Sequence, residues 1–186
     1  MKRILLPVLA LALTTAAPVA FAQPKKEKTV EVGGAPMYPS KNIVENAVNS
    51  KDHTTLVAAV KAAGLVETLA SPGPFTVFAP TNAAFNKLPA GTVDGLLKPE
   101  AKSTLTSVLT YHVVAGNMDS KMLMDAIKKG GGKATLTTVQ GGKLIAMRKG
   151  NGISVMDSKG GTAMVSIKDV YQSNGVIHVV DKVLMP

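Results

Sequence analysis

The sequence of 186 residues contains no cysteine and no tryptophan, and aromatic residues make up 4% of it. Without cysteine the chain has no disulfide framework, no thiolate metal site, no thiol nucleophile and no cysteine for lipid attachment. Arginine is also scarce, since Arg3 and Arg148 are the two in the chain. Nucleic-acid recognition relies heavily on arginine forks and aromatic stacking. The composition therefore argues against a nucleic-acid partner.

The formal net charge is nevertheless +9, and lysine carries most of it. Loss of Lys2 and Arg3 with the N-terminal leader described below lowers this charge to +7. A surplus of this size favours loose association with anionic envelope polymers or surfaces. General solubility is the alternative explanation of the same charge.

The N-terminus has the three-part pattern of an export signal. Lys2 and Arg3 precede an apolar run over Ile4–Leu13, and the small-residue cleavage sequence Ala20-Phe21-Ala22 follows. Prolines and threonines interrupt this run before it reaches the roughly 20 apolar residues that a spanning helix needs. The sequence predicts a signal peptide over residues 1–22 and an exported protein, periplasmic or secreted, with no transmembrane segment after cleavage.

The remaining chain divides into a short arm and one domain. Residues 23–40 mix charges with glycine and proline without periodicity, which predicts a flexible linker. From residue 41 to 186, helical patterns come first and strand patterns later, which predicts a single α+β domain. Asp52 is expected to cap a helix within residues 42–70, and Thr81 or Asn82 a helix after Pro80. Further helices are predicted after Pro99 and over Asp119–Lys128, and strands over Phe75–Phe78, Tyr111–Val114, 135–139, 143–148, 152–156, 163–168 and 176–184.

Residue types that carry catalysis or bind metals are few and scattered. The three histidines, His53, His112 and His178, are far apart, and none belongs to a His-Glu-x-x-His motif. No serine lies in a Gly-x-Ser-x-Gly turn, and the carboxylates occur singly, without a calcium-binding loop. The sequence predicts a protein that is not an enzyme, with no catalytic residue, cofactor or metal site. The open alternative is a site formed by residues that lie far apart in the sequence and that folding brings together.

The residues around His112 and His178 indicate where these two histidines lie in the fold. On a strand, Tyr111 and His112 point to opposite faces, so one of them is expected in the core. In a structural interpretation, His112 bonds to backbone groups and the Tyr111 ring anchors the core. His178 lies in the apolar run Val176–Val180, which predicts a central strand covered on both faces, with His178 as a satisfied core group.

Three segments, found in the expected order, resemble the sequence motifs of the fasciclin domain family. They are Phe75-Thr-Val-Phe-Ala-Pro-Thr-Asn-Ala-Ala-Phe85, Leu109-Thr-Tyr-His-Val-Val-Ala-Gly116 and Asn174-Gly-Val-Ile-His-Val-Val-Asp-Lys-Val-Leu-Met-Pro186. The resemblance covers residues 41–186. In its layout the chain is similar to single-domain secreted bacterial members of the family. The resemblance implies a seven-stranded β-sandwich or wedge with packed N-terminal and central helices. Asn82, where the family commonly has aspartate, and Met185, in place of an aliphatic residue, are small departures.

The resemblance also implies a function. Fasciclin domains mediate cell adhesion or contact with extracellular or envelope protein or polysaccharide surfaces, and their Tyr-His motif is associated with receptor interaction. Tyr111 and His112 are therefore candidate partner-binding residues, with the structural interpretation still open. Because some family members bind carotenoids, the alternative is a carrier of an apolar small molecule such as a carotenoid or lipid. The methionines fit either use, as core filling or as a lipophilic groove: Met118, Met122, Met124, Met147, Met156 and Met164.

Overall fold

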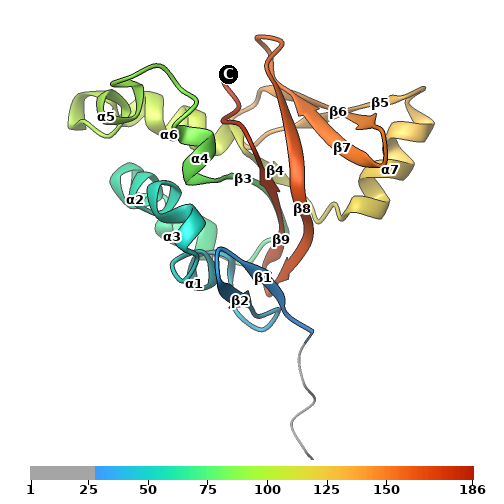
Figure 1. Cartoon of the computed structure of the whole chain (residues 1–186), viewed down its shortest axis with the longest axis horizontal. Coiled ribbons are helices and arrows are strands. Elements are labelled where there is room, and N and C mark those ends of the chain that lie inside the picture. The colour runs from blue at the N-terminus through green and yellow to red at the C-terminus, as the bar shows by residue number, and fades with distance from the viewer. Residues whose placement is uncertain (1–27) are drawn as a thin grey trace, which may run out of the picture.

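The computed structural model describes residues 28–186 and is shown in Figure 1. The predicted signal peptide lies outside the described residues. In chain order the elements are β1 (Val30–Val32), β2 (Ala35–Met37), α1 (Ile43–Ala47), η1 (Lys51–His53), α2 (Thr54–Ala63), α3 (Val66–Ala70), β3 (Phe75–Pro80), α4 (Asn82–Phe85), α5 (Thr92–Leu96), η2 (Pro99–Ala101), α6 (Lys102–Tyr111), β4 (Val113–Ala115), α7 (Ser120–Lys129), β5 (Lys133–Thr137), β6 (Lys143–Lys149), β7 (Gly152–Met156), β8 (Thr162–Gln172) and β9 (Gly175–Val180).

A seven-stranded sheet in the order β4-β3-β9-β8-β7-β6-β5 forms the frame of the domain. Its one parallel pair, β3 with β9, brings together two of the segments that resemble fasciclin motifs. All six residues of β9 are buried, because β3 and β8 flank it in the sheet and side chains cover both of its faces. This confirms the central strand that the apolar run Val176–Val180 predicts.

The long strand β8 bends the sheet into a wedge. Its pairing with β9 shifts register between Val165 and Ile167 and again between Ile167 and Val170, and such irregularities bend and twist a strand. The far edges of the wedge nearly meet, because the Val139 N–H donates to the Val113 carbonyl at 2.7 Å. Figure 1 shows β5–β7 and α7 on one side of β8 and the early helices on the other. The α+β wedge is confirmed.

Two apolar cores lie on either side of the β3–β9 pair. The first joins α1, α2, α3 and the β1–β2 hairpin to one face of the sheet, with Val77, Ile177 and Val179 at its centre. The second lies inside the wedge, where Leu123 and Ile127 of α7 pack on strands β5–β8. Alternation along β3 and β9 divides their side chains between the cores, since successive residues of a strand face opposite sides.

The linker expected over residues 23–40 is wrong for the part of it that the structure describes. Val30–Val32 and Ala35–Met37 form an antiparallel hairpin, and Val32 and Met37 are buried in the first core. Gly33 and Gly34, which the sequence pattern suggested as breakers, have φ of 60° and 75°. A two-residue hairpin turn with positive φ at both positions favours glycine. The two glycines therefore form the turn of the hairpin. Because the hairpin packs in the first core, the domain begins before residue 41.

The helical pattern predicted over residues 42–70 contains α1, α2 and α3, but the predicted cap of α2 is wrong. Asp52 lies within η1, and the N-cap position of α2, His53, makes no side-chain cap bond. Asn82 caps the helix from outside, because its Oδ1 accepts the Thr55 N–H at 3.0 Å. The helix after Pro80 begins as expected, with the Thr81 side chain accepting from the Ala84 N–H at 3.2 Å.

Candidate functional site

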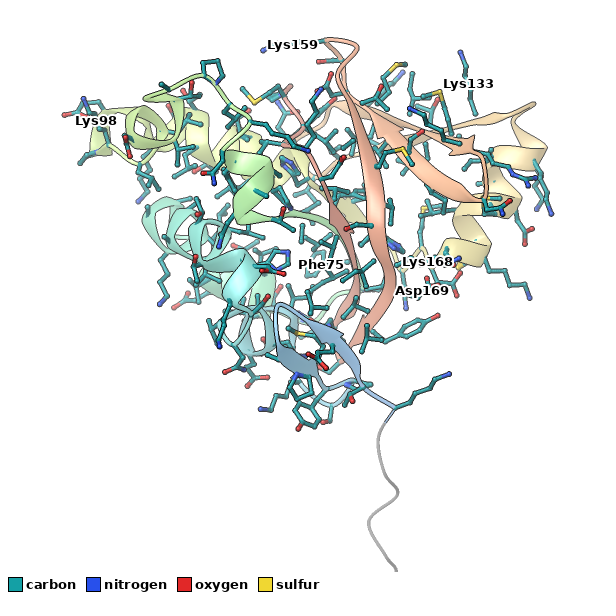
Figure 2. The ribbon with its side chains drawn as sticks, in the orientation of Figure 1. Phe75, Lys98, Lys133, Lys159, Lys168 and Asp169 are labelled. Carbon is teal, nitrogen blue, oxygen red and sulfur yellow. The ribbon has the colours of Figure 1, made fainter. Side chains whose placement is uncertain are left out.

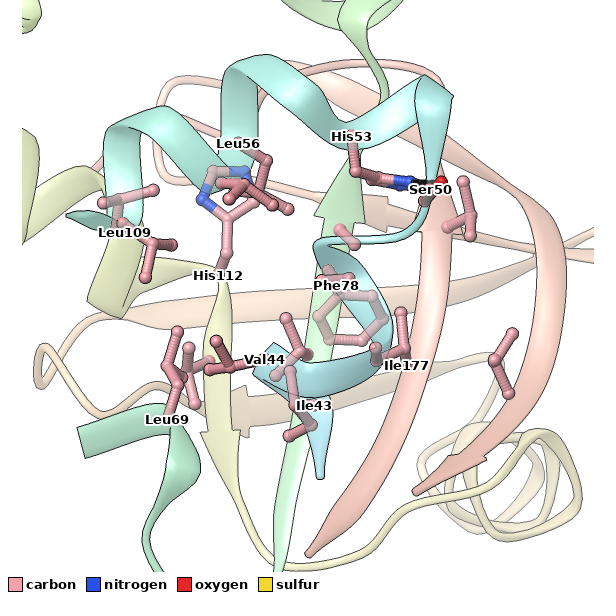
Figure 3. Close-up of a pocket in the computed structure, with 18 of the residues that line it drawn as sticks. Ile43, Val44, Ser50, His53, Leu56, Leu69, Phe78, Leu109, His112 and Ile177 are labelled. Atoms are coloured by element: carbon pink, nitrogen blue, oxygen red, sulfur yellow. Dashed lines mark hydrogen bonds between the residues drawn. The ribbon is translucent and has the colours of Figure 1, made fainter. Parts of the chain in front are cut away.

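An apolar cavity of about 60 Å³ lies within the first core, between the early helices and the sheet (Figure 3). The cavity is lined by helices α1, α2, α3 and α6, by strands β3, β4, β8 and β9, and by the β1–β2 hairpin. Apolar side chains make up most of the wall, among them Met37, Ile43, Leu56, Leu69, Ile177 and Val179. Ser50, His53, Lys61 and His112 are its polar members. The cavity is therefore mostly apolar, with two imidazoles in its wall.

His53 has one unsatisfied ring nitrogen. Its Nδ1 lies 2.9 Å from Ser50 Oγ, drawn as a dashed line in Figure 3. Its buried Nε2 has no hydrogen-bond partner among the described residues. Burial lowers the pKa of His53, and the Ala79 backbone and the Asp52 carboxylate oppose this shift. A neutral His53 thus offers one free donor or acceptor, depending on its tautomer.

His112 has both ring nitrogens satisfied. Nδ1 lies 2.8 Å from the Val108 carbonyl and therefore carries the hydrogen, while Nε2 accepts the Leu184 N–H at 2.9 Å. Burial lowers the pKa of His112 to about 4, although the Val108 carbonyl and the Asp157 carboxylate oppose the shift. The neutral ring ties the end of α6 to the C-terminal segment.

Tyr111 joins a different set of segments. Its hydroxyl donates to the Lys143 carbonyl at 2.7 Å and accepts the Ser158 N–H at 3.0 Å. The side chain is 1% exposed and lies in the second core. Tyr111 therefore connects α6 with the start of β6 and with the β7–β8 loop.

The strand predicted over Tyr111–Val114 is wrong in its first half. Tyr111 is the last residue of α6 and His112 is its C-cap, with the His112 N–H donating to the Leu109 carbonyl at 3.1 Å. The β-branched pair Val113-Val114 begins β4. The helix continues through Tyr111 because no glycine or proline ends it earlier, whereas the predicted strand started two residues too soon. The motif still separates its side chains, since Tyr111 enters the second core and His112 the cavity wall.

His178 behaves as predicted. It is fully buried and stacks on Phe78 with ring centroids 5.7 Å apart. Its Nε2 donates to the Met118 carbonyl at 2.9 Å, and Nδ1 accepts the Asp169 N–H at 3.4 Å. Burial is the main cause that lowers the pKa of His178. His178 is a satisfied core group, and the structure keeps it separate from the cavity wall.

Asn174, the first residue of the third motif segment, has a role that the sequence did not predict. Its Oδ1 accepts the Ile43 N–H at 3.0 Å, and its Nδ2 donates to the carbonyls of Leu69 and Ser71 at 2.8 and 2.9 Å. These partners lie more than 100 positions away along the chain, so no local pattern announces them. Asn174 holds α1 and α3 against the entry of β9 and thereby positions the cavity wall.

The methionines divide between the two uses that the sequence allowed. Met118 and Met124 pack against the second core, which fits core filling. Met122 is 52% exposed on α7. Met147, Met156 and Met164 are each partly exposed, and none belongs to a core cluster.

None of the helices over residues 28–186 has the length and apolarity required to cross a membrane. The same residues hold no group of three or more His, Asp or Glu side chains placed to share a metal ion.

The sequence from residue 51 to 186 matches the Fasciclin domain family. The chain belongs to this family. Protein sll1483 of Synechocystis is 45% identical over 161 residues, which cover 86% of this chain and 82% of that protein. Cell surface glycolipoprotein MPB83 of Mycobacterium bovis is 39% identical over 122 residues, or 66% of this chain and 48% of that protein.

The fold also has a solved counterpart. A FAS1 domain pair from the insect cell adhesion molecule Fasciclin I aligns with a TM-score of 0.70 and 16% identity, covering 87% of this chain. The match takes in 59% of the longer chain, which contains two such domains. At this identity the likeness concerns the fold, and it agrees with the wedge that the fasciclin resemblance predicts.

Proposed function

We propose that this fasciclin domain is an exported, non-enzymatic module that attaches to a protein or polysaccharide surface in the cell envelope or the extracellular space. The observation that carries the proposal is the family match over residues 51–186. Relatives by sequence include a cell surface glycolipoprotein, and the fold is that of an insect cell adhesion molecule. The surplus of lysine supports a partner with anionic character.

Tyr111 and His112 take part in this function as positioning residues. Their side chains are 1% and 2% exposed, so neither is available for direct contact in this conformation. Their hydrogen bonds instead hold the start of β6, the β7–β8 loop and the C-terminal segment. A substitution in this pair is expected to weaken attachment only as far as it displaces those segments.

The test is binding of the fluorescently labelled chain, residues 23–186, to isolated envelopes of the source organism and to a deposited extracellular matrix. Cytochrome c, a small basic protein, serves as the control for charge alone. Saturable binding that unlabelled chain competes away, and that cytochrome c does not, is the expected result. Binding that cytochrome c reproduces on both surfaces would overturn the proposal.

A carrier of an apolar small molecule is the second candidate, and the cavity with the free Nε2 of His53 favours it. Its size sets a limit, because a dry cavity that binds benzene has about 150 Å³ and this one has about 60 Å³. A carotenoid therefore requires α1–α3 to move away from the sheet. The test is an absorption spectrum, with mass spectrometry of an organic extract, on protein purified from its native host. A stoichiometric pigment or lipid supports the carrier, and a clean extract contradicts it.

A further inference from the structure

The outer face of strands β5–β8, opposite the second core, carries two regular rows of side chains. One row runs across four strands as Lys133, Met147, Ser154 and Met164, which are directly paired neighbours. The next row on the same face, two residues along each strand, is Thr135, Ile145, Met156 and Thr162. Side chains of a strand alternate between faces, so all eight share one side of the sheet.

The row of residues between these two rows identifies the side of the sheet on which they lie. Ala134, Ala146, Val155 and Ala163 are paired across the same strands, and each is at most 7% exposed within the second core, which α7 covers. Met147, Met156 and Met164 therefore point away from that core and from α7.

The four large apolar side chains of the outer rows are partly exposed and form one continuous patch. Ile145, Met147, Met156 and Met164 belong to none of the core clusters. Ser154, between Met147 and Met164 in its row, is 2% exposed. The neighbouring methionines therefore shield the hydroxyl, whose acceptor is the Met147 carbonyl at 3.4 Å. A methionine surface is adaptable and apolar without being rigid.

Positive charge surrounds this patch. Lys133, Lys143 and Lys149 are exposed on the same face of β5 and β6. Lys133 ends one apolar row, and Lys143 and Lys149 lie on β6 just beyond Ile145 and Met147. Residues 133–168 hold six basic residues and one acidic residue, Asp157. Asp157 is 6% exposed and accepts the Lys159, Gly161 and Met185 N–H groups. Asp181, which accepts the Met164 N–H at 2.7 Å, lies 3.7 Å from Lys87 Nζ, so a lysine opposes its charge. The surplus charge of this part of the surface is therefore positive.

We infer that the methionine face of β5–β8, framed by Lys133, Lys143 and Lys149, docks on an anionic lipid bilayer. The partly exposed methionines match the boundary between headgroups and acyl chains, and the lysines match lipid phosphates. A polyanionic polysaccharide would use the lysines but not the apolar rows, and aromatic residues, which commonly contact sugars, are absent from those rows. The inference deepens the proposed function and rests on it, because it names the chemistry of the surface that is bound.

The experiment measures co-sedimentation of residues 23–186 with phosphatidylcholine vesicles and with vesicles that also contain phosphatidylglycerol. The combined variant Lys133→Gln, Lys143→Gln, Lys149→Gln removes charge from the docking face. Lys51→Gln, Lys98→Gln, Lys102→Gln is the matched control with the same net charge, on exposed positions of the helical side. Figure 2 shows Lys98 and Lys133 at opposite ends of the molecule.

Binding is expected to need the anionic lipid and to weaken with salt. A lysine near an anionic membrane strengthens binding about fivefold, so the docking-face variant should lose on the order of 100-fold in affinity. The control variant should lose only a few fold through the general loss of charge. Equal losses in the two variants, or no binding to anionic vesicles by the unchanged chain, would overturn the inference.

A second readout reports on the apolar rows. The chain contains no tryptophan, so Met156→Trp introduces a single reporter on the docking face and Tyr38→Trp a reporter on the exposed hairpin side. Anionic vesicles should shift the emission of the first to the blue and leave the second unchanged. A blue shift at 156 without lipid, with a dimer in sedimentation, would instead assign the face to a second copy of the chain. A shift with dextran sulfate but not with vesicles would assign it to a polysaccharide.

The outcome also separates the inference from the proposed function. A chain that binds isolated envelopes but neither kind of vesicle keeps the function as a surface module and loses the lipid assignment. A chain that binds anionic vesicles but not envelopes or matrix keeps the docking face and loses the broader function.

Discussion

Adjacent residues at the end of α6 hold distant segments of the chain in place. Tyr111 bonds to the backbone of Lys143 and Ser158, and His112 to that of Val108 and Leu184. Each side chain satisfies two backbone groups that burial would otherwise leave unpaired, which is costly in a low-dielectric interior. At this scale, Tyr111 and His112 are structural residues that hold distant backbone segments together.

Replacement of Tyr111 by phenylalanine removes one oxygen atom and leaves the ring. The Lys143 carbonyl and the Ser158 N–H lose their partner, so the free energy of unfolding should fall by about 1–3 kcal/mol. Tyr171→Phe is the control, because its hydroxyl lies 3.4 Å from Asp119 on an exposed strand position, and it should change stability by less than about 0.5 kcal/mol. Urea unfolding of both variants compares the two values, and equal losses would contradict the fastening role.

The pKa of His112 predicts loss of stability in mild acid. The folded pKa is about 4 and the ordinary value is 6.5, so between these pH values the unfolded chain binds more protons than the folded chain. Stability is therefore complete above pH 6.5, falls as pH decreases, and reaches a loss of about 3 kcal/mol for this group near pH 4. His53 and His178, with lowered pKa values, add to the same direction.

Urea unfolding at a series of pH values measures this effect. The variant His112→Gln is less stable at neutral pH but should show a smaller decrease between pH 6.5 and 4, because its side chain does not titrate. An unchanged slope in the variant would show that His112 is not a source of the acid sensitivity.

At the scale of elements, helix α2 depends on a residue outside it. Asn82 accepts the Thr55 N–H and donates to the Lys51 carbonyl and to Thr54 Oγ1, at 3.0, 2.9 and 3.0 Å. One side chain thus joins the start of α2 to α4 and the end of β3. The sequence position at which the family commonly has aspartate therefore supplies a cap across the fold.

Removal of this cap should cost about 1–2 kcal/mol of stability, as for caps within a helix. Asn82→Ala tests the loss. Asn82→Asp is the matched variant, because a carboxylate still accepts from Thr55 and interacts favourably with the helix N-terminus. Thermal unfolding should place the aspartate variant between the unchanged chain and the alanine variant, because the carboxylate keeps the bond from Thr55 but cannot donate to the Lys51 carbonyl. Equal effects of the two substitutions would contradict capping by Asn82.

At the scale of the whole molecule, the described domain begins with the β1–β2 hairpin. Val32 and Met37 are 4% and 3% exposed in the first core. Asn46 bonds to both the N–H and the carbonyl of Tyr38, at 3.0 and 2.8 Å. The hairpin also contributes the end wall of the cavity. It is therefore part of the domain and of the candidate site.

Truncation measures this contribution. A chain that begins at residue 41 loses the burial of Val32 and Met37 and should be about 3–6 kcal/mol less stable, at about 1.5–3 kcal/mol for each buried side chain. A chain that begins at residue 28 keeps the hairpin and should match one that begins at residue 23. Calorimetry of the three chains compares them, and a fully stable 41–186 chain would restore the linker interpretation.

Local patterns in the sequence were sufficient for the fold class and for most elements. The strand β7 was predicted with its observed bounds, Gly152–Met156, and the core position of His178 followed from the apolar residues on both sides of it. Strand alternation and turn chemistry act over a few residues, so one sequence contains them. The three motif segments likewise indicated the family, because each is a short continuous stretch of the chain.

Tertiary structure decided everything that depends on partners far along the chain. The role of Tyr111 and His112 follows from bonds to residues 32, 47 and 72 positions away, and the cap of α2 from a residue 27 positions away. The alignment of Met147, Met156 and Met164 on one face follows from the register between β6, β7 and β8. Periodicity determines which face of its own strand a side chain occupies, whereas strand pairing and packing determine its neighbours. The sequence by itself therefore determined the family and most of the elements, and only the packing of the sheet and helices created the cavity and the basic methionine face.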